Sequence, residues 1–200
     1  MKNVHTSVKL LACSALLMAM NIIMSMSAFS IPVPGGHMYL NDLIIVTAGI
    51  LLDPLHAAVV GGVGAFIGDL LFYPAPMFVS LVTHGLQALV ISSCTRHLFK
   101  KSGRQGRIRG SVLGAIFGWL ITVAGYTFGR AYIYGTPAYA VLKLPFQFLQ
   151  TAVGSTAALL LCWKLGVVKL FDEIVGIESY SYDGKNAPGF GNSGSSDSTS

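Results

Sequence analysis

The sequence predicts an all-α integral membrane protein with six transmembrane helices. Of its 200 residues, 53% are hydrophobic and only 10% are charged, whereas soluble domains carry about 25% charged residues. A soluble domain of this length could not bury so much apolar surface in one core. The apolar residues also form successive runs of roughly spanning length, separated by short polar or Pro/Gly-containing segments.

The distribution of positive charge predicts the topology. Lys2 and Lys9 precede the first apolar run, and Lys164 and Lys169 follow the last one. Six more basic residues crowd one segment between apolar runs: Arg96, Lys100, Lys101, Arg104, Arg107 and Arg109. Such clusters can bind nucleic acid, but beside membrane spans the positive-inside rule explains them better. We therefore expect no nucleic-acid partner, and both termini in the cytoplasm.

The first apolar run, residues 10–29, predicts a retained transmembrane helix. A signal peptide is the alternative, but its apolar region usually has only about 7–15 residues, and about 20 apolar residues is a spanning length. Ala15 and Ala19 form a pair of small residues four apart, which lets another helix approach closely. Spacing alone leaves open whether that helix belongs to this chain or to another protein.

Residues 30–40 predict an outer loop, which contains no Lys or Arg. Pro32 and Pro34 should stiffen it, and Gly35-Gly36 should let it turn.

The second helix is predicted over residues 41–52, which is short for a full span, so we expect it to be tilted or sheltered by neighbouring helices. Asn41 or Asp42 is a suitable N-cap, and Asp42 is expected to act as an interfacial cap rather than as a ligand contact. Asp53-Pro54 predicts the following turn.

The third and fourth helices are predicted over residues 56–72 and 77–99, with an outer turn at residues 73–76. Gly64 and Gly68 give a GxxxG step in the third helix, which indicates tight helix contact.

The fifth and sixth helices are predicted over residues 111–130 and 140–163. Pro145 lies in the early turns of the sixth helix, where it is tolerated or produces a kink. The six helices form one domain, residues 1–175. Residues 176–200 are rich in Gly, Ser, Asn and Asp and predict a disordered tail.

Polar residues near the outer ends of these helices predict a binding pocket that opens outward, because ionisable groups within spans are costly and commonly functional. The candidate substrate-binding residues are Asn41, Asp69, His84, Gln87, Tyr126, Arg130, Lys143, Gln147 and Gln150. Lys143, Gln147 and Gln150 share one helical stripe, and three polar residues on one face favour a wet cavity. The candidate apolar or stacking walls are Phe72, Tyr73, Trp119 and Phe146.

Structural alternatives exist for several of these residues. Asp69 could pair with Arg130 or Lys143, and His84 with Gln87 could form an interhelical hydrogen bond. Arg130 and Lys143 flank the outer side, against the positive-inside rule, so they need either such a partner or a function.

Catalytic signatures are missing from the sequence. It contains no HExxH, GxSxG, CxxC or Walker lysine motif. Cys13, Cys94 and Cys162 are far apart and show neither disulfide nor metal spacing. We therefore predict no enzyme activity, no metal and no cofactor, and any energy for transport must come from ions or from partner subunits.

The segment IPVPGGHMYLNDLIIVTAGILLDPLHAAVVGGVGAFIGDLLFYPAPMFVSLVTHGLQALV, within a six-span region of about residues 7–170, resembles the S components of energy-coupling factor (ECF) vitamin transporters, in the riboflavin-type group. The shared features are the Gly-Gly loop, the following Leu-Asn-Asp, the Gly-rich third helix ending in Gly-Asp-Leu-Leu, and the Pro-led fourth helix.

The resemblance implies a substrate-binding subunit in a prokaryotic cell membrane. Such proteins bind a vitamin or precursor at the outer face and work with a transmembrane T component and two ATP-binding subunits. Ala15 and Ala19 match the family's Ala-x-x-x-Ala motif, which docks on the T component. Arg130 and Lys143 would suit a carboxylate or another electron-rich group. Pantothenate, a pyrimidine or pyridine vitamin precursor, and riboflavin remain open.

Two other functions are alternatives to an S component. A stand-alone secondary transporter would be favoured by inverted repeats, but residues 7–72 and 77–163 show no convincing similarity. A membrane enzyme would use His84 and Asp69 as an acid–base pair.

Overall fold

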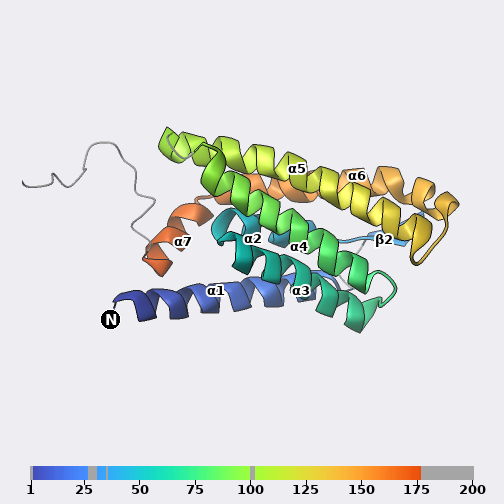
Figure 1. Ribbon diagram of the computed structural model, residues 1–200, viewed down its shortest axis with the longest axis horizontal. Coiled ribbons are helices and arrows are strands. Elements are labelled where there is room, and N and C mark those ends of the chain that lie inside the picture. Colours follow the sequence, from blue (N-terminus) through green and yellow to red (C-terminus); the bar gives the residue numbers. More distant parts are fainter. Residues whose placement is uncertain (1, 27–30, 35, 100–101, 177–200) are drawn as a thin grey trace, which may run out of the picture.

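The computed structural model describes residues 2–26, 31–34, 36–99 and 102–176, and these form a lengthwise bundle of helices (Figure 1). The helices are α1 (Lys2–Met24), α2 (Asn41–Leu51), α3 (Pro54–Phe72), α4 (Met77–Ser93), η2 (Cys94–Leu98), α5 (Gly103–Tyr132), α6 (Pro137–Trp163) and α7 (Val167–Val175). Strand β1 (Ile31–Val33) pairs antiparallel with β2 (Gly36–Met38). This hairpin lies at one end of the bundle, and α7 lies at the other together with the start of α1 (Figure 1).

Within the described ranges, four helical segments are long and apolar enough to cross a membrane: Pro54–Phe72, Met77–Leu98, Gly103–Tyr132 and Pro137–Trp163. Two further apolar segments, Val8–Met24 and Asn41–Leu51, are shorter. The structure therefore agrees with an all-α membrane protein, and six crossings stay a prediction.

The helix bounds differ from the sequence prediction at several ends. Helix α5 begins at Gly103 instead of residue 111, so part of the predicted basic loop is helical. The α-helical part of the fourth helix ends at Ser93, and a π-helix, Cys94–Leu98, continues it. The hairpin and α7 were not predicted. Residues 27–29 of the first predicted helix and the predicted tail beyond Gly176 lie outside the described residues.

Helix α2 lies at the centre of the bundle, where it contacts α1, α3, α4, α6 and α7. All of its 11 residues are buried except Leu43, which is partly buried. A helix of that length spans only about 16 Å, roughly half of a bilayer's hydrocarbon core. The prediction that its neighbours shelter it is confirmed.

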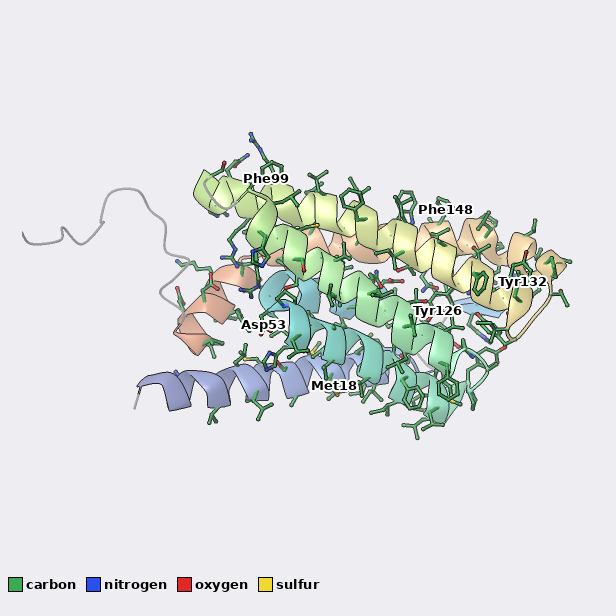
Figure 2. All side chains as sticks on the ribbon, viewed as in Figure 1. Met18, Asp53, Phe99, Tyr126, Tyr132 and Phe148 are labelled. Atoms are coloured by element: carbon green, nitrogen blue, oxygen red, sulfur yellow. The ribbon has the colours of Figure 1, made fainter. Side chains whose placement is uncertain are left out.

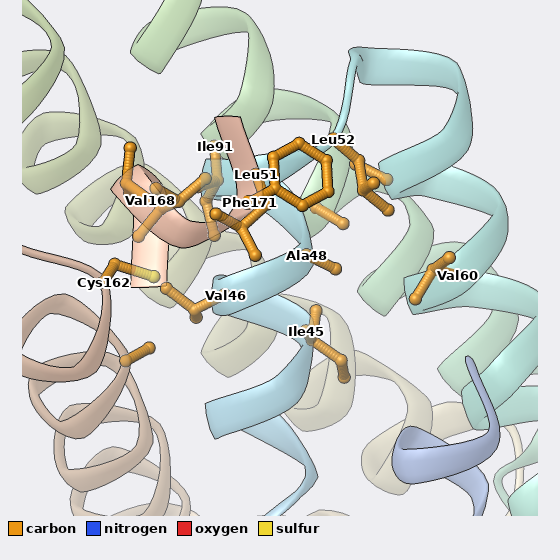
Figure 3. Close-up of a cluster of buried hydrophobic side chains, with 14 of the residues drawn as sticks. Ile45, Val46, Ala48, Leu51, Leu52, Val60, Ile91, Cys162, Val168 and Phe171 are labelled. Carbon is orange, nitrogen blue, oxygen red and sulfur yellow. The ribbon is translucent and has the colours of Figure 1, made fainter. Parts of the chain in front are cut away.

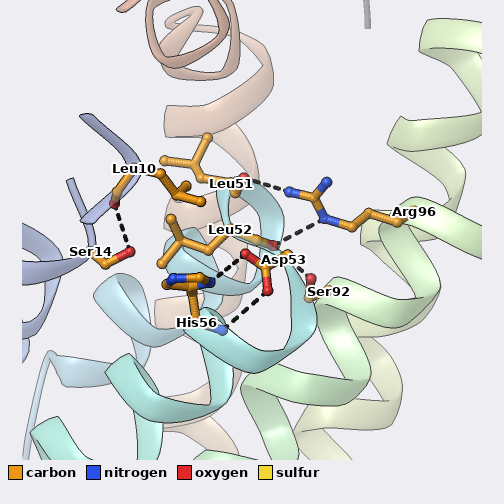
Figure 4. A network of polar contacts seen from close by, with 8 residues as sticks. All are labelled: Leu10, Ser14, Leu51, Leu52, Asp53, His56, Ser92 and Arg96. Carbon is orange, nitrogen blue, oxygen red and sulfur yellow. Dashed lines mark hydrogen bonds and ion pairs between the residues drawn. The ribbon is translucent and has the colours of Figure 1, made fainter. Parts of the chain in front are cut away.

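The C-terminal end of α2 is capped by side chains of the fourth helical segment (Figure 4). Arg96 donates to the Leu51 carbonyl oxygen from Nη2 at 2.8 Å and to the Leu52 carbonyl oxygen from Nε at 3.1 Å. Ser92 Oγ also donates to the Leu52 carbonyl, at 2.6 Å. Carbonyls at a helix end lack partners within the helix. Arg96, expected only as a marker of topology, therefore also satisfies the buried end of α2.

The hydrophobic core lies around this same half of α2 (Figure 3). Ile45 and Ala48 of α2 are fully buried there, and Val168 and Phe171 of α7 pack against the same cluster. Arg107 of α5 forms an ion pair with Asp172 of α7, with Nη1 and Oδ2 3.1 Å apart. The short α7 thus closes the end of the bundle where the basic residues of α5 gather.

Glycines allow the closest helix contacts, as the GxxxG step predicted. A Cβ at Gly64 would lie 2.7 Å from Asn21 Nδ2, and one at Gly68 would lie 2.6 Å from Ser25 Oγ. Asn21 Nδ2 also donates to the Val60 carbonyl at 2.9 Å. Helix α1 is therefore held against α3 by close packing and by a buried hydrogen bond.

The α3–α4 contact gives a test with an internal control. A Cβ at Gly61 would lie 2.7 Å from the His84 carbonyl oxygen, whereas one at Gly85 would meet its nearest atoms at 3.6 Å. We expect Gly61→Ala to destabilise the protein by about 1–3 kcal/mol because the backbones must move apart. Gly85→Ala should be neutral or stabilising by up to about 1 kcal/mol, since alanine favours helix. Thermal unfolding in detergent measures both, and equal melting temperatures would contradict this packing.

Candidate functional site

A cavity of about 260 Å³ lies at the hairpin end of the bundle. It is lined by His37, Tyr39, Asn41, Asp69, Tyr73, Pro76, His84, Tyr126, Arg130, Tyr134, Tyr139, Lys143, Gln147 and Gln150. These residues come from α3, α4, α5 and α6, from the start of α2 and from the hairpin region. Tyr126 and Tyr132 mark this half of the molecule in Figure 2, and Asp53 and Phe99 mark the other.

Eight of the nine predicted substrate-binding residues line this cavity: Asn41, Asp69, His84, Tyr126, Arg130, Lys143, Gln147 and Gln150. The ninth, Gln87, is fully buried behind them, where it contacts His84 and Asp42. The structure thus brings the predicted set together, and its binding of a solute stays a prediction.

Asp42 is a buried hydrogen-bond acceptor between three helices. Its Oδ1 accepts from Gln87 Nε2 at 3.0 Å, and its Oδ2 accepts from Gln150 Nε2 at 3.0 Å and from Thr151 Oγ1 at 3.4 Å. The expected role as an interfacial cap is wrong: the N-cap residue of α2 is Leu40, no side chain caps that end, and Asp42 has no exposed surface. Asp42 instead fixes α2, α4 and α6 beneath the cavity.

A chain of hydrogen bonds runs along one wall from Asp69. Ser80 Oγ donates to Asp69 Oδ2 and lies 2.5 Å from Tyr126 Oη. Tyr126 Oη lies 3.0 Å from His84 Nε2, and His84 Nδ1 lies 2.7 Å from Gln87 Oε1. The predicted hydrogen bond between His84 and Gln87 is confirmed, although it lies within α4. The contacts with other helices are those of His84 with Tyr126 and of Gln87 with Asp42.

The hydroxyl and imidazole groups of this chain connect three helices. Tyr126 of α5 contacts both Ser80 and His84 of α4, and Ser80 donates to Asp69 of α3. The chain therefore fixes the wall of the cavity at which α3, α4 and α5 meet.

Arg130 and Lys143 are the two cationic residues of the cavity lining, and they are 7% and 2% exposed. Arg130 Nη2 donates to Gln147 Oε1 at 2.8 Å, and the guanidinium lies 5.2 Å from the centre of the Tyr126 ring. Lys143 Nζ donates to the His37 carbonyl at 2.7 Å. The structural alternative that Asp69 pairs with either cation is wrong: no such ion pair occurs among the described residues.

Three buried polar atoms of the lining have no hydrogen-bond partner within the described residues: Asn41 Oδ1, Arg130 Nη1 and Gln147 Nε2. Buried polar groups are nearly always paired, and an unpaired one calls for a water, ion or ligand. The cavity therefore presents at least one acceptor and two donors without partners to whatever occupies it.

Tyrosines supply most of the aromatic wall: Tyr39, Tyr73, Tyr126, Tyr134 and Tyr139. Of the four predicted wall residues only Tyr73 lines the cavity. Trp119 instead packs edge-on against Phe148, with ring centres 5.0 Å apart, and Phe72 is 41% exposed. Most of the missed tyrosines stand just outside helix ends or in the first turn of a helix, where helical periodicity gave no signal.

The phenols at the rim stay protonated at neutral pH. Burial raises the pKa of Tyr39, of Tyr73 and of Tyr134 above the ordinary value of about 10. Each can therefore donate a hydrogen bond to a solute.

A match to a protein-family model identifies the family of this chain. The model of the ECF-type riboflavin transporter, S component, matches residues 5–166. The chain belongs to this family of S components. It is also 30% identical over 126 residues to an uncharacterised protein from Pyrococcus woesei named for its position in a gap 3′ region, and the match covers 62% of this chain and 80% of that protein.

The family assignment bears on the alternative that the protein is a membrane enzyme. The family is one of transporter S components and is not an enzyme family, which counts against the membrane-enzyme alternative for His84 and Asp69. No group of three or more His, Cys, Asp or Glu side chains that could hold a metal occurs among the described residues.

The Asp42 junction gives a second test. Asp42→Asn replaces one accepting oxygen by an NH₂ group that would face the amide of Gln87 or Gln150, so a buried donor loses its acceptor. We expect a loss of about 1–3 kcal/mol in unfolding free energy. The control is Asp53→Asn, a partly exposed N-cap of α3, where asparagine caps equally well. Equal thermal stability of the two variants would show that Asp42 does not hold the helices together.

Proposed function

We propose that this S component binds a water-soluble vitamin or vitamin precursor in the cavity at the hairpin end. It then delivers that solute for ATP-driven uptake together with a transmembrane T component and two ATP-binding subunits. The main support for the proposal is the cavity. The chain belongs to a family of transporter subunits, and it has a polar, tyrosine-lined cavity with unpaired donors and an unpaired acceptor.

The charge distribution supports an outward-facing cavity. Arg96, Arg107 and Lys169 lie in or beside η2, the start of α5 and α7, at the end opposite the hairpin (Figure 1). Under the positive-inside rule that end faces the cytoplasm. The cavity then opens to the outside, where an importer must meet its solute.

The exposed side of α1 suits docking on a T component. Ala15 and Ala19 are exposed, as are Leu11, Leu16 and Met20 on the same helix. Small residues four apart let a second helix come close. The close glycine contacts of α3 with α1 and α4 support a subunit that moves as one body when its partners hydrolyse ATP.

Binding tests the proposal directly. The full chain, purified in mild detergent, should retain a small molecule in native mass spectrometry and hydrolyse no ATP. Lys143→Ala with Gln147→Ala should weaken binding of that molecule at least about tenfold, because each residue is expected to contribute a hydrogen bond or charge. Val153→Ala with Thr156→Ala, at exposed positions of α6, is the matched control. Unchanged affinity in the first variant would place the site elsewhere.

Assembly tests the partner surface. Ala15→Leu with Ala19→Leu should abolish co-purification of the T component and leave solute binding intact, since the larger side chains keep the helices apart. Ala124→Leu with Ala152→Leu makes the same change at exposed positions on α5 and α6 and should leave the complex intact. Equal recovery of the T component with both variants would refute this docking face.

A further inference from the structure

Two unpaired donors lie next to each other in the cavity wall. Arg130 Nη2 donates to Gln147 Oε1 at 2.8 Å, so the planar guanidinium and amide groups meet, and each has a further nitrogen that is buried without a partner among the described residues. These nitrogens are Arg130 Nη1 and Gln147 Nε2. Both residues are more than nine-tenths buried and both line the cavity.

Such donors require an acceptor from the bound solute. A buried donor left unpaired costs roughly 1–3 kcal/mol, and more when it is charged. A guanidinium presents its N–H groups in a flat fork that matches the two oxygens of a carboxylate. The Gln147 amide supplies another N–H beside that fork.

The two buried cations of the cavity also favour an anionic solute. Arg130 and Lys143 both line the cavity and are more than nine-tenths buried. Neither forms an ion pair with a carboxylate among the described residues. A buried charge without a counter-charge is costly, and an anionic group of the solute would supply that counter-charge.

The opposite requirement comes from Asn41. Its Oδ1 is a buried acceptor without a partner, so the solute should also have an N–H or O–H group. The volume of about 260 Å³ is just below the range of about 300–1,000 Å³ typical for drug-sized ligands, which favours a compact molecule.

We propose that the solute of this S component is a compact carboxylate, whose carboxylate oxygens accept from Arg130 Nη1 and Gln147 Nε2 and whose own N–H or O–H group donates to Asn41 Oδ1. The inference rests on the proposed function and narrows its substrate class. A phosphate ester fits less well, since it brings close to two negative charges into a cavity whose lining also contains the carboxyl group of Asp69.

Matched pairs of acid and neutral compound test this inference. The full chain in lipid nanodiscs is titrated calorimetrically with pantothenate and pantothenol, which also have N–H and O–H groups, and with riboflavin and its 5′-phosphate. Nicotinate and nicotinamide form a third pair, in which the acid has a carboxylate but no N–H or O–H group for Asn41, so nicotinate should bind more weakly than pantothenate. We expect at least one carboxylate to bind, and to bind at least about tenfold tighter than its neutral partner, because a hydrogen bond to a charged group contributes about 1.5–3 kcal/mol.

Two variants of the cavity test where the carboxylate of the solute binds. Arg130→Gln should weaken binding of the carboxylate by about 10- to 100-fold and leave the weak binding of the neutral partner nearly unchanged. Gln147→Glu places a second carboxylate beside Arg130 and should also exclude the acid, while its new ion pair with Arg130 supports folding. Arg109→Gln, an exposed arginine at the other end of α5, is the control. Size-exclusion profiles and melting temperatures establish that each variant is folded.

The outcomes separate this inference from the proposed function. Suppose that riboflavin or its phosphate binds tightly and that Arg130→Gln does not change this affinity. That result would contradict the inference of a carboxylate solute and would leave the proposed function as a vitamin-binding subunit intact. Binding of none of the six compounds, with no small molecule co-purified, would contradict the proposed function and the inference with it. If Arg130→Gln and Gln147→Glu each lose binding of the carboxylate but keep binding of its neutral partner, the result supports both the inference and the proposed function.

Discussion

The structure depends on how a short, buried helix is joined to its neighbours by polar contacts near both of its ends. Helix α2 has 11 residues and lies among five other helices, so its terminal peptide groups cannot reach bulk water. At its C-terminal end Arg96 and Ser92 donate to the last carbonyls. Near its N-terminal end the buried carboxylate of Asp42 collects donors from α4 and α6. The central helix thereby joins its neighbours by polar contacts at two levels, with the apolar core between them.

Because α2 stops short, space remains between its N-terminal end and the hairpin, and the cavity occupies that space. Its walls are kept in place by hydrogen bonds that cross between helices, through Tyr126 on one side and Gln150 on the other. The hairpin region is attached through its backbone, since Lys143 binds the His37 carbonyl and Gln150 accepts from the Tyr39 amide. A cavity held in this way would lose little conformational entropy on binding the solute that we propose. The cavity-lining residues Lys143 and Gln150 thus also hold the segment around His37 and Tyr39 in place.

Most of this arrangement could be predicted from the sequence because a membrane protein makes polar residues conspicuous. An arginine, a lysine and several amides in otherwise apolar helices are costly unless they meet one another or a ligand, and eight of the nine candidates do line one cavity. The GxxxG step likewise predicted a close contact, because few other reasons place glycines at that spacing within a helix.

What could not be predicted depends on contacts between distant segments. Asp42 resembles an ordinary N-cap in sequence, and only the position of Gln87 and Gln150 reveals it as a junction. The missed tyrosines of the cavity lie mainly in loops and at helix ends, where spacing does not report direction. Helix α7 follows a polar break after α6, and its role appears only when Phe171 packs against the core of α2.

A crystal or cryo-EM structure of the purified protein with its bound solute would decide where the solute lies. We expect density for one compact molecule between Arg130, Gln147 and Asn41, above an α2 end still joined through Asp42 to α4 and α6. Density for the solute outside this cavity, or a cavity filled by side chains while solute is bound elsewhere, would contradict the proposed site.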